Sequence, residues 1–159
     1  MELTAIHKRV VGLDVHQAQI TACAILEAPD GEVRIEQRQF GGFKKDRQAL
    51  AHWVQGQQPE LVVMESTGIY WKGPYASLEA LGISATVVNA RHVKQVPGRK
   101  TDIADAQWLA MLARAGLLRG RSPSAPMSLT RSLSYGSKPS ERMNSSAWSI
   151  PAHVKLSGK

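Results

Sequence analysis

The 159-residue sequence has one cysteine and no apolar run long enough to span a membrane. Cys23 alone can form neither an internal disulfide nor a cysteine-based zinc cluster, which favours a reducing compartment. The N-terminus has no apolar stretch of the kind found in secretory signals, and Walker A, G-x-S-x-G and H-E-x-x-H motifs are missing. These absences predict a cytoplasmic protein that has no membrane partner.

Acidic residues are scarce in one part of the chain. Residues 121–159 contain one acidic residue against six Lys/Arg, and eleven of them are serine. The net charge of +7 therefore comes mainly from this tail, and it is only a weak indication of a nucleic-acid partner. The tail shows no sustained apolar period from which a core could form. We expect one domain at residues 1–120, followed by a basic Ser/Pro-rich tail that is either natively disordered or frame-shifted.

The predicted domain alternates short apolar runs with amphipathic segments. Strands are expected at 10–16, 20–26, 33–40, 61–64 and 83–88, helices at 44–58, 71–81 and 102–118, and a basic loop or short helix at 91–100. The first three strands, joined by short turns, should form an antiparallel meander. This order predicts an α/β fold, a mixed five-stranded sheet with flanking helices, and it is the order of the RNase H-like fold.

Two acidic residues lie at predicted strands. Asp14 interrupts an apolar strand whose Leu13 and Val15 should face the other side of the sheet. A buried carboxylate is unfavourable unless it is paired or binds a cation, but an aspartate that accepts hydrogen bonds in a turn is an equally good explanation. Glu65 follows the apolar run of the fourth strand, at the sheet edge where α/β proteins usually bind ligands. A solvated glutamate at the end of a strand is the alternative.

Two further acids stand at the start of the last predicted helix. Asp102 and Asp105 are three residues apart, which places them on one face of that helix. The same half of the helix carries apolar residues from Ala106 to Leu117, so both carboxylates should point toward the core. A helix cap or the helix dipole would explain one aspartate, but not why both share the apolar face.

The four carboxylates form an ordered D…E…D-x-x-D pattern that can converge at one edge of the sheet. The residues are Asp14, Glu65, Asp102 and Asp105. An all-oxygen cluster suits Mg²⁺ or Mn²⁺. Two such ions, about 4 Å apart, could hold the attacking and leaving oxygens of a phosphodiester displacement. Repulsion between the carboxylates should raise the pKa of at least one of them.

A group of basic residues precedes the last two acids. Arg91, Lys94, Arg99 and Lys100 crowd the segment before Asp102. Next to a metal site these side chains could contact nucleic-acid phosphates. A solvated charged loop is the alternative reading.

Three separated stretches of the sequence resemble DEDD-type insertion-sequence transposases. They are GLDVH (12–16), MESTGIYW (64–71) and VVNARHVKQVPGRKTDIADAQWLA (87–110), which MLARAGLL follows. The resemblance covers residues 8–120 and implies a RuvC-like domain that works with a structured guide RNA, the bridge RNA of this family. It implies the four carboxylates as the catalytic and metal-binding tetrad and DNA strand exchange as the activity. It also implies DNA as a partner and a homo-oligomer for the full-length protein.

The tail departs from this resemblance. Family members continue into a helical segment and a second domain, which supplies a serine nucleophile thought to attack DNA. Residues 121–159 match neither part, so none of their serines can be given that role. We therefore expect a truncated or frame-shifted transposase that retains only the RuvC-like module.

Two functions from different classes follow. The leading prediction is a metal-dependent DNA transposase or recombinase module. The alternative is a catalytically silent nucleic-acid-binding module, or a pseudogene product, with the same fold. A small-molecule α/β enzyme is disfavoured because the sequence carries no cofactor fingerprint.

Overall fold

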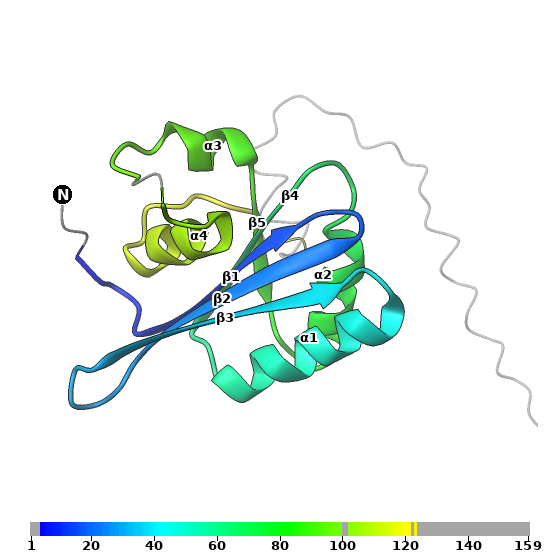
Figure 1. Ribbon diagram of the computed structural model, residues 1–159, viewed down its shortest axis with the longest axis horizontal. Coiled ribbons are helices and arrows are strands. Elements are labelled where there is room, and N and C mark those ends of the chain that lie inside the picture. Colours follow the sequence, from blue (N-terminus) through cyan, green and yellow to red (C-terminus); the bar gives the residue numbers. More distant parts are fainter. Residues whose placement is uncertain (1–3, 100–101, 122, 124–159) are drawn as a thin grey trace, which may run out of the picture. The chain divides into compact units, whose positions relative to one another are not determined.

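Five strands form one mixed sheet in the order β3-β2-β1-β4-β5 (Figure 1). The computed structural model describes residues 4–99, 102–121 and 123. The strands are β1 (Arg9–Val15), β2 (Gln19–Glu27), β3 (Val33–Gly41), β4 (Leu61–Ser66) and β5 (Ala85–Val88). The first three form an antiparallel meander, while β4 pairs parallel to β1 and β5 pairs parallel to β4. The predicted antiparallel meander and mixed five-stranded sheet are therefore confirmed.

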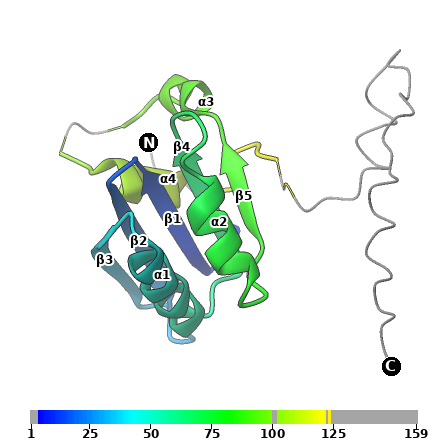
Figure 2. The ribbon, with the colours of Figure 1, turned by 90° about the vertical axis from the view of Figure 1, so that its right-hand side faces the viewer.

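Helices cover both faces of this sheet (Figure 2). They are α1 (Lys44–Gln57), α2 (Lys72–Glu79), α3 (Ala90–Gln95) and α4 (Asp105–Arg114). The largest buried cluster joins α1 and α2 to one face, through Leu50 and Leu78 among others. Helix α4 packs on the other face, where Leu109 lies in a second cluster with Val63 of β4. Within the described residues, no helix is long and apolar enough to cross a membrane.

Alternation along β1 decides which side chains meet each layer. Val11, Leu13 and Val15 are buried against α1 and α2. Val10 packs with α4, and Asp14 follows it by four residues on the same face. The expectation that Asp14 and its two neighbours face opposite sides of the sheet is therefore confirmed.

The last helix is shorter than the predicted 102–118. Helix α4 begins at Asp105, its N-cap is Ala104, and no side chain caps it. At the other end Gly116 takes a φ of +71°, and the amide of Leu117 donates to the carbonyl of Leu112 at 3.0 Å. This glycine-based C-cap reverses the chain. Leu117 consequently leaves the apolar face predicted for it and is 47% exposed.

Candidate functional site

Two of the predicted carboxylates are neighbours across two parallel strands. Asp14 of β1 and Glu65 of β4 are register partners at the carboxyl ends of these strands. Val63 packs against α4 and Met64 against the opposite layer, so the alternation places Glu65 on the α4 face together with Asp14. Asp14 is 9% exposed and Glu65 is half-buried. The parallel pairing thus concentrates two negative charges in a partly buried place.

Helix α4 brings a third carboxylate to the same face. At Gly12 of β1, an added Cβ would lie 2.7 Å from both the carbonyl oxygen of Ala106 and the amide nitrogen of Ala110. The missing side chain therefore lets the backbone of α4 rest directly on β1. Asp105, the first residue of α4, is consequently held near the carboxyl ends of the two strands.

The pKa of Glu65 reports how close these charges are. Burial raises the pKa of this carboxyl above its ordinary value, and the negative charges of Asp14 and Asp105 raise it further. His16 and Lys94 act in the opposite direction on the pKa of Glu65. The predicted rise of at least one pKa is confirmed, with desolvation as the larger cause.

Basic groups stand beside the carboxylates. The Nε2 atom of His16 lies 3.3 Å from Oδ2 of Asp14. The Nη2 atom of Arg99 lies 2.7 Å from Oδ1 of Asp105 and also donates to the carbonyl oxygen of Ile103 at 2.6 Å. Arg99 therefore faces an aspartate in this structure, although the sequence suggested a phosphate contact.

The fourth predicted carboxylate lies apart from this group. Asp102 is exposed in the turn before α4 and does not contribute to the pKa shift of Glu65. Because the helix begins three residues later, Asp102 and Asp105 do not share a helical face. The structure therefore brings three of the four predicted acids together.

The predicted basic residues have different surroundings. Arg91 and Lys94 are exposed on the short helix α3, and Lys94 is near enough to lower the pKa of Glu65. Lys100 lies outside the described residues, as do 124–159 of the predicted tail. Arg91 also borders a cavity of about 650 Å³ beyond the ends of β4 and β5. Its wall includes Arg121, which sequence reasoning missed and which is held by two backbone hydrogen bonds to Val87.

The donors of this site match a hard divalent cation in kind. Carboxylate oxygens are the ligands that Mg²⁺ and Mn²⁺ prefer, and a cation would relieve the repulsion that raises the pKa of Glu65. Across the part of the chain that the structure describes, no group of three or more His, Cys, Asp and Glu residues stands at metal-binding spacing. The donors are thus of the right kind, but in this structure Asp14 contacts His16 and Asp105 contacts Arg99, so the described acids do not stand at metal-binding distances from one another.

The architecture is that of an RNase H-like domain of the RuvC type. The structure of RuvC from Thermus thermophilus in complex with a Holliday junction substrate matches it with a TM-score of 0.52 at 13% identity, over 72% of this chain and 100% of that one. Another Thermus thermophilus RuvC structure matches with a TM-score of 0.51 at 13% identity, over 71% and 99%. The predicted fold class is thereby confirmed.

A profile of the DEDD_Tnp_IS110 transposase family matches residues 11–134. The chain belongs to this family, as the resemblance of its three motifs indicated. No curated protein gives a significant match.

Proposed function

We propose that this domain supports the metal-dependent cleavage of DNA phosphodiester bonds during transposition. The observation that carries the proposal is the pairing of Asp14 with Glu65 in register at the carboxyl ends of β1 and β4, with Asp105 near enough to raise the pKa of Glu65. Membership in a transposase family supports the same chemistry. The RuvC structure with this fold holds a Holliday junction substrate, which supports a branched DNA partner in the proposal.

The residues of the chain would share the work as follows. Asp14, Glu65 and Asp105 would hold the cations. Divalent ions, when bound, would supply charge stabilisation for the phosphate and an activated oxygen nucleophile. His16 orients the carboxylate of Asp14 through the contact at 3.3 Å. Lys94, beside Glu65, would contact the phosphate backbone.

Asp102 completes the tetrad in our proposal. It is exposed three residues before Asp105, and it would be the fourth carboxylate to hold the cations. Arg99 pairs with Asp105 in this structure, so it would have to release this carboxylate for cation binding and would then be available to a phosphate. Arg91 would add a further phosphate contact from α3, and Lys100, which precedes Asp102 in the sequence, is proposed to do the same.

The other partners in the proposal come from the family resemblance. We propose a structured guide RNA and a homo-oligomeric assembly, with the covalent serine chemistry in a separate domain. The described domain would then contribute the carboxylate- and metal-dependent chemistry of strand exchange, and the other domain would contribute the serine. On its own we expect it to nick DNA slowly and to form no joined product.

A second function is a silent nucleic-acid-binding module. The specific observation in its favour is the Arg99–Asp105 ion pair, which gives one of the acids an internal cationic partner. The two functions make different predictions for variants: removal of a carboxylate abolishes DNA cleavage only if the domain is a nuclease.

Nicking of supercoiled plasmid by the purified chain tests the proposal. With Mg²⁺ we expect slow conversion to open circles, and we expect Asp14→Asn, Glu65→Gln and Asp102→Asn each to reduce it to background. Glu79→Gln neutralises an exposed acid at the end of α2 and serves as the control. Nicking that persists in EDTA, or that survives Asp14→Asn, would contradict the proposal. The absence of any Mg²⁺-dependent nicking would also contradict it and would favour the silent module.

A further inference from the structure

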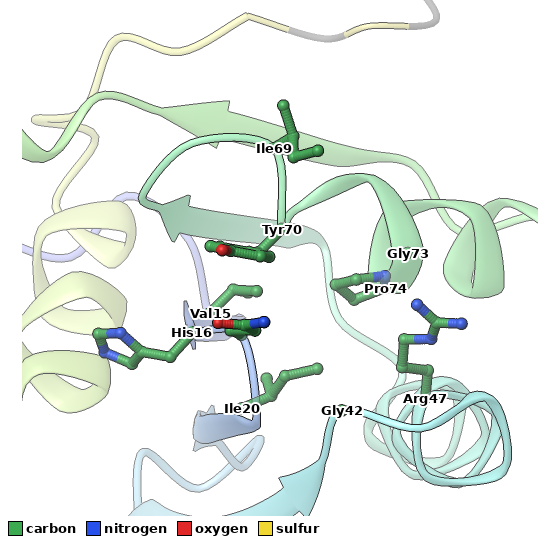
Figure 3. Close-up of a pocket in the computed structure, with 10 residues that line it drawn as sticks. Val15, His16, Ile20, Gly42, Arg47, Ile69, Tyr70, Gly73 and Pro74 are labelled. Atoms are coloured by element: carbon green, nitrogen blue, oxygen red, sulfur yellow. The ribbon is translucent and has the colours of Figure 1, made fainter.

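A cavity of about 170 Å³ opens on the α1/α2 side of the sheet, beside the ends of β1 and β4 (Figure 3). Its walls include His16 and Gln17 after β1, Tyr70 after β4, Arg47 of α1, and Gly73 and Pro74 of α2. Figure 3 shows the ring of Tyr70 above the end of β1 and the side chain of Arg47 directed toward Gly73. The cavity thus combines an aromatic face, a side-chain amide and a guanidinium.

Arg47 lacks the partners that a half-buried cation normally has. Its Nε atom is buried and has no hydrogen-bond partner within the described residues. The described ion pairs do not include Arg47 either. A buried donor without an acceptor is unfavourable, so a missing acceptor is the simplest reason for this placement.

The fold makes room for this guanidinium at one position of α2. A Cβ added at Gly73 would collide with Nη1 of Arg47. The position that Nη1 takes in this structure therefore depends on glycine at residue 73, and a larger residue would make the end of the Arg47 side chain shift. Because residue 73 has no side chain, the guanidinium of Arg47 can occupy the space that a Cβ of α2 would otherwise fill.

The cavity lies next to the carboxylate site. His16 borders the cavity, while its Nε2 atom contacts Asp14 on the other side of the sheet edge. Arg47 also borders a second cavity of about 350 Å³ between α1 and α2, whose wall includes Lys44. Two positive groups, Arg47 and Lys44, therefore line the surface that leads away from His16 and the carboxylates. A chain of phosphates matches this arrangement better than a single free anion does.

We propose that Arg47 binds a backbone phosphate of the nucleic-acid strand that reaches the carboxylate site, with the adjoining nucleoside against Tyr70 and Gln17. The guanidinium fork matches phosphate geometry, and the amide of Gln17 can bond to a base or sugar. The inference rests on the proposed function in one respect, namely that the strand is a nucleic acid. The nucleic-acid strand would thus contact this half-buried pocket as well as the exposed basic residues around α3.

Fluorescence anisotropy with a labelled single-stranded oligonucleotide, in EDTA, tests this assignment on the full chain. We expect Arg47→Gln to weaken binding about tenfold, because a charge-assisted contact is lost. The slope of log K against log salt should fall by about 0.7, the value for one phosphate contact on a single strand. Lys45→Gln removes the same charge from an exposed neighbouring position of α1, and it should change binding less than about twofold. DNA and RNA strands are measured in parallel, and an effect on either one identifies the strand that uses the pocket.

Two further variants distinguish a specific effect of the pocket on binding from an effect of overall charge or of misfolding. Gly73→Ala keeps every charge but shifts the end of the Arg47 side chain, so it should weaken binding by less than Arg47→Gln does. Arg47→Lys preserves the charge and should restore only part of the affinity, because ammonium lacks the fork. Equal losses from Arg47→Gln and Lys45→Gln would overturn the proposal. Because the assay contains no metal, a failure of cleavage would contradict the proposed function without touching this result.

Discussion

Near the carboxyl ends of β1 and β4, the two faces of the sheet carry charges of opposite sign. On the α4 face, Asp14, Glu65 and Asp105 gather, and burial together with repulsion raises the pKa of Glu65. On the α1/α2 face, the cation Arg47 is half-buried and its Nε atom has no partner among the described residues. One face thus attracts cations and the other attracts an anion. A phosphodiester strand together with divalent ions would satisfy both faces at once.

The largest effect should come from separating α4 from the sheet. Gly12→Ala places a methyl group against the backbone of α4, so we expect a loss of about 1–3 kcal/mol in the free energy of unfolding. Asp105 should move away from Asp14 and Glu65, and nicking should fall to background. Thermal melting and the plasmid assay measure the two effects.

Gly56→Ala is the matched control for this substitution. Gly56 lies in α1 and a Cβ there meets nothing within 4 Å. Alanine should therefore stabilise the helix by about 0.4–1 kcal/mol and leave nicking unchanged. If Gly12→Ala were as harmless as Gly56→Ala, the close contact between α4 and β1 would not be what positions Asp105.

A smaller effect is expected from the ion pair of Arg99 with Asp105. Both side chains are solvent-exposed, so the pair is worth about 1 kcal/mol at most. Arg99→Gln should therefore lower the Mg²⁺ concentration needed for half-maximal nicking by up to about fivefold. A higher Mg²⁺ requirement in this variant would show that Arg99 positions Asp105 rather than competing for it.

The smallest effect concerns pH. Because the pKa of Glu65 is raised in the folded state, the folded protein binds more protons, and stability falls as pH rises from the ordinary glutamate pKa through the raised one. Glu65→Gln removes this penalty. The melting temperature should therefore rise slightly at neutral pH relative to the wild type, and the gain should shrink in acid. A gain that grows in acid would contradict the sign of this shift.

The strands could be predicted from the sequence because buried and exposed side chains alternate along a strand with a period of two residues. Apolar runs around Asp14 and before Glu65 predicted strands, and the alternation of Leu13, Asp14 and Val15 predicted which face each side chain meets. The helix predicted at 102–118 was wrong at both ends. It starts at Asp105 and is closed by Gly116 in the left-handed region. Gly116 falls inside the predicted helix, although the conformational freedom of glycine makes it a natural helix terminator.

Sequence by itself determined the element order, the transposase motifs and the identity of the acids, because local periodicity and motif spacing are properties of the chain alone. The catalytic role of the four carboxylates and the domain limit at 120 remain predictions. Tertiary structure decided which charges meet. Parallel pairing set Asp14 beside Glu65, and the backbone contact at Gly12 brought Asp105 near them. It also placed Arg47 beside Gly73. In the sequence Arg47 is one cation among many, because a pocket between two helices arises only when they pack together.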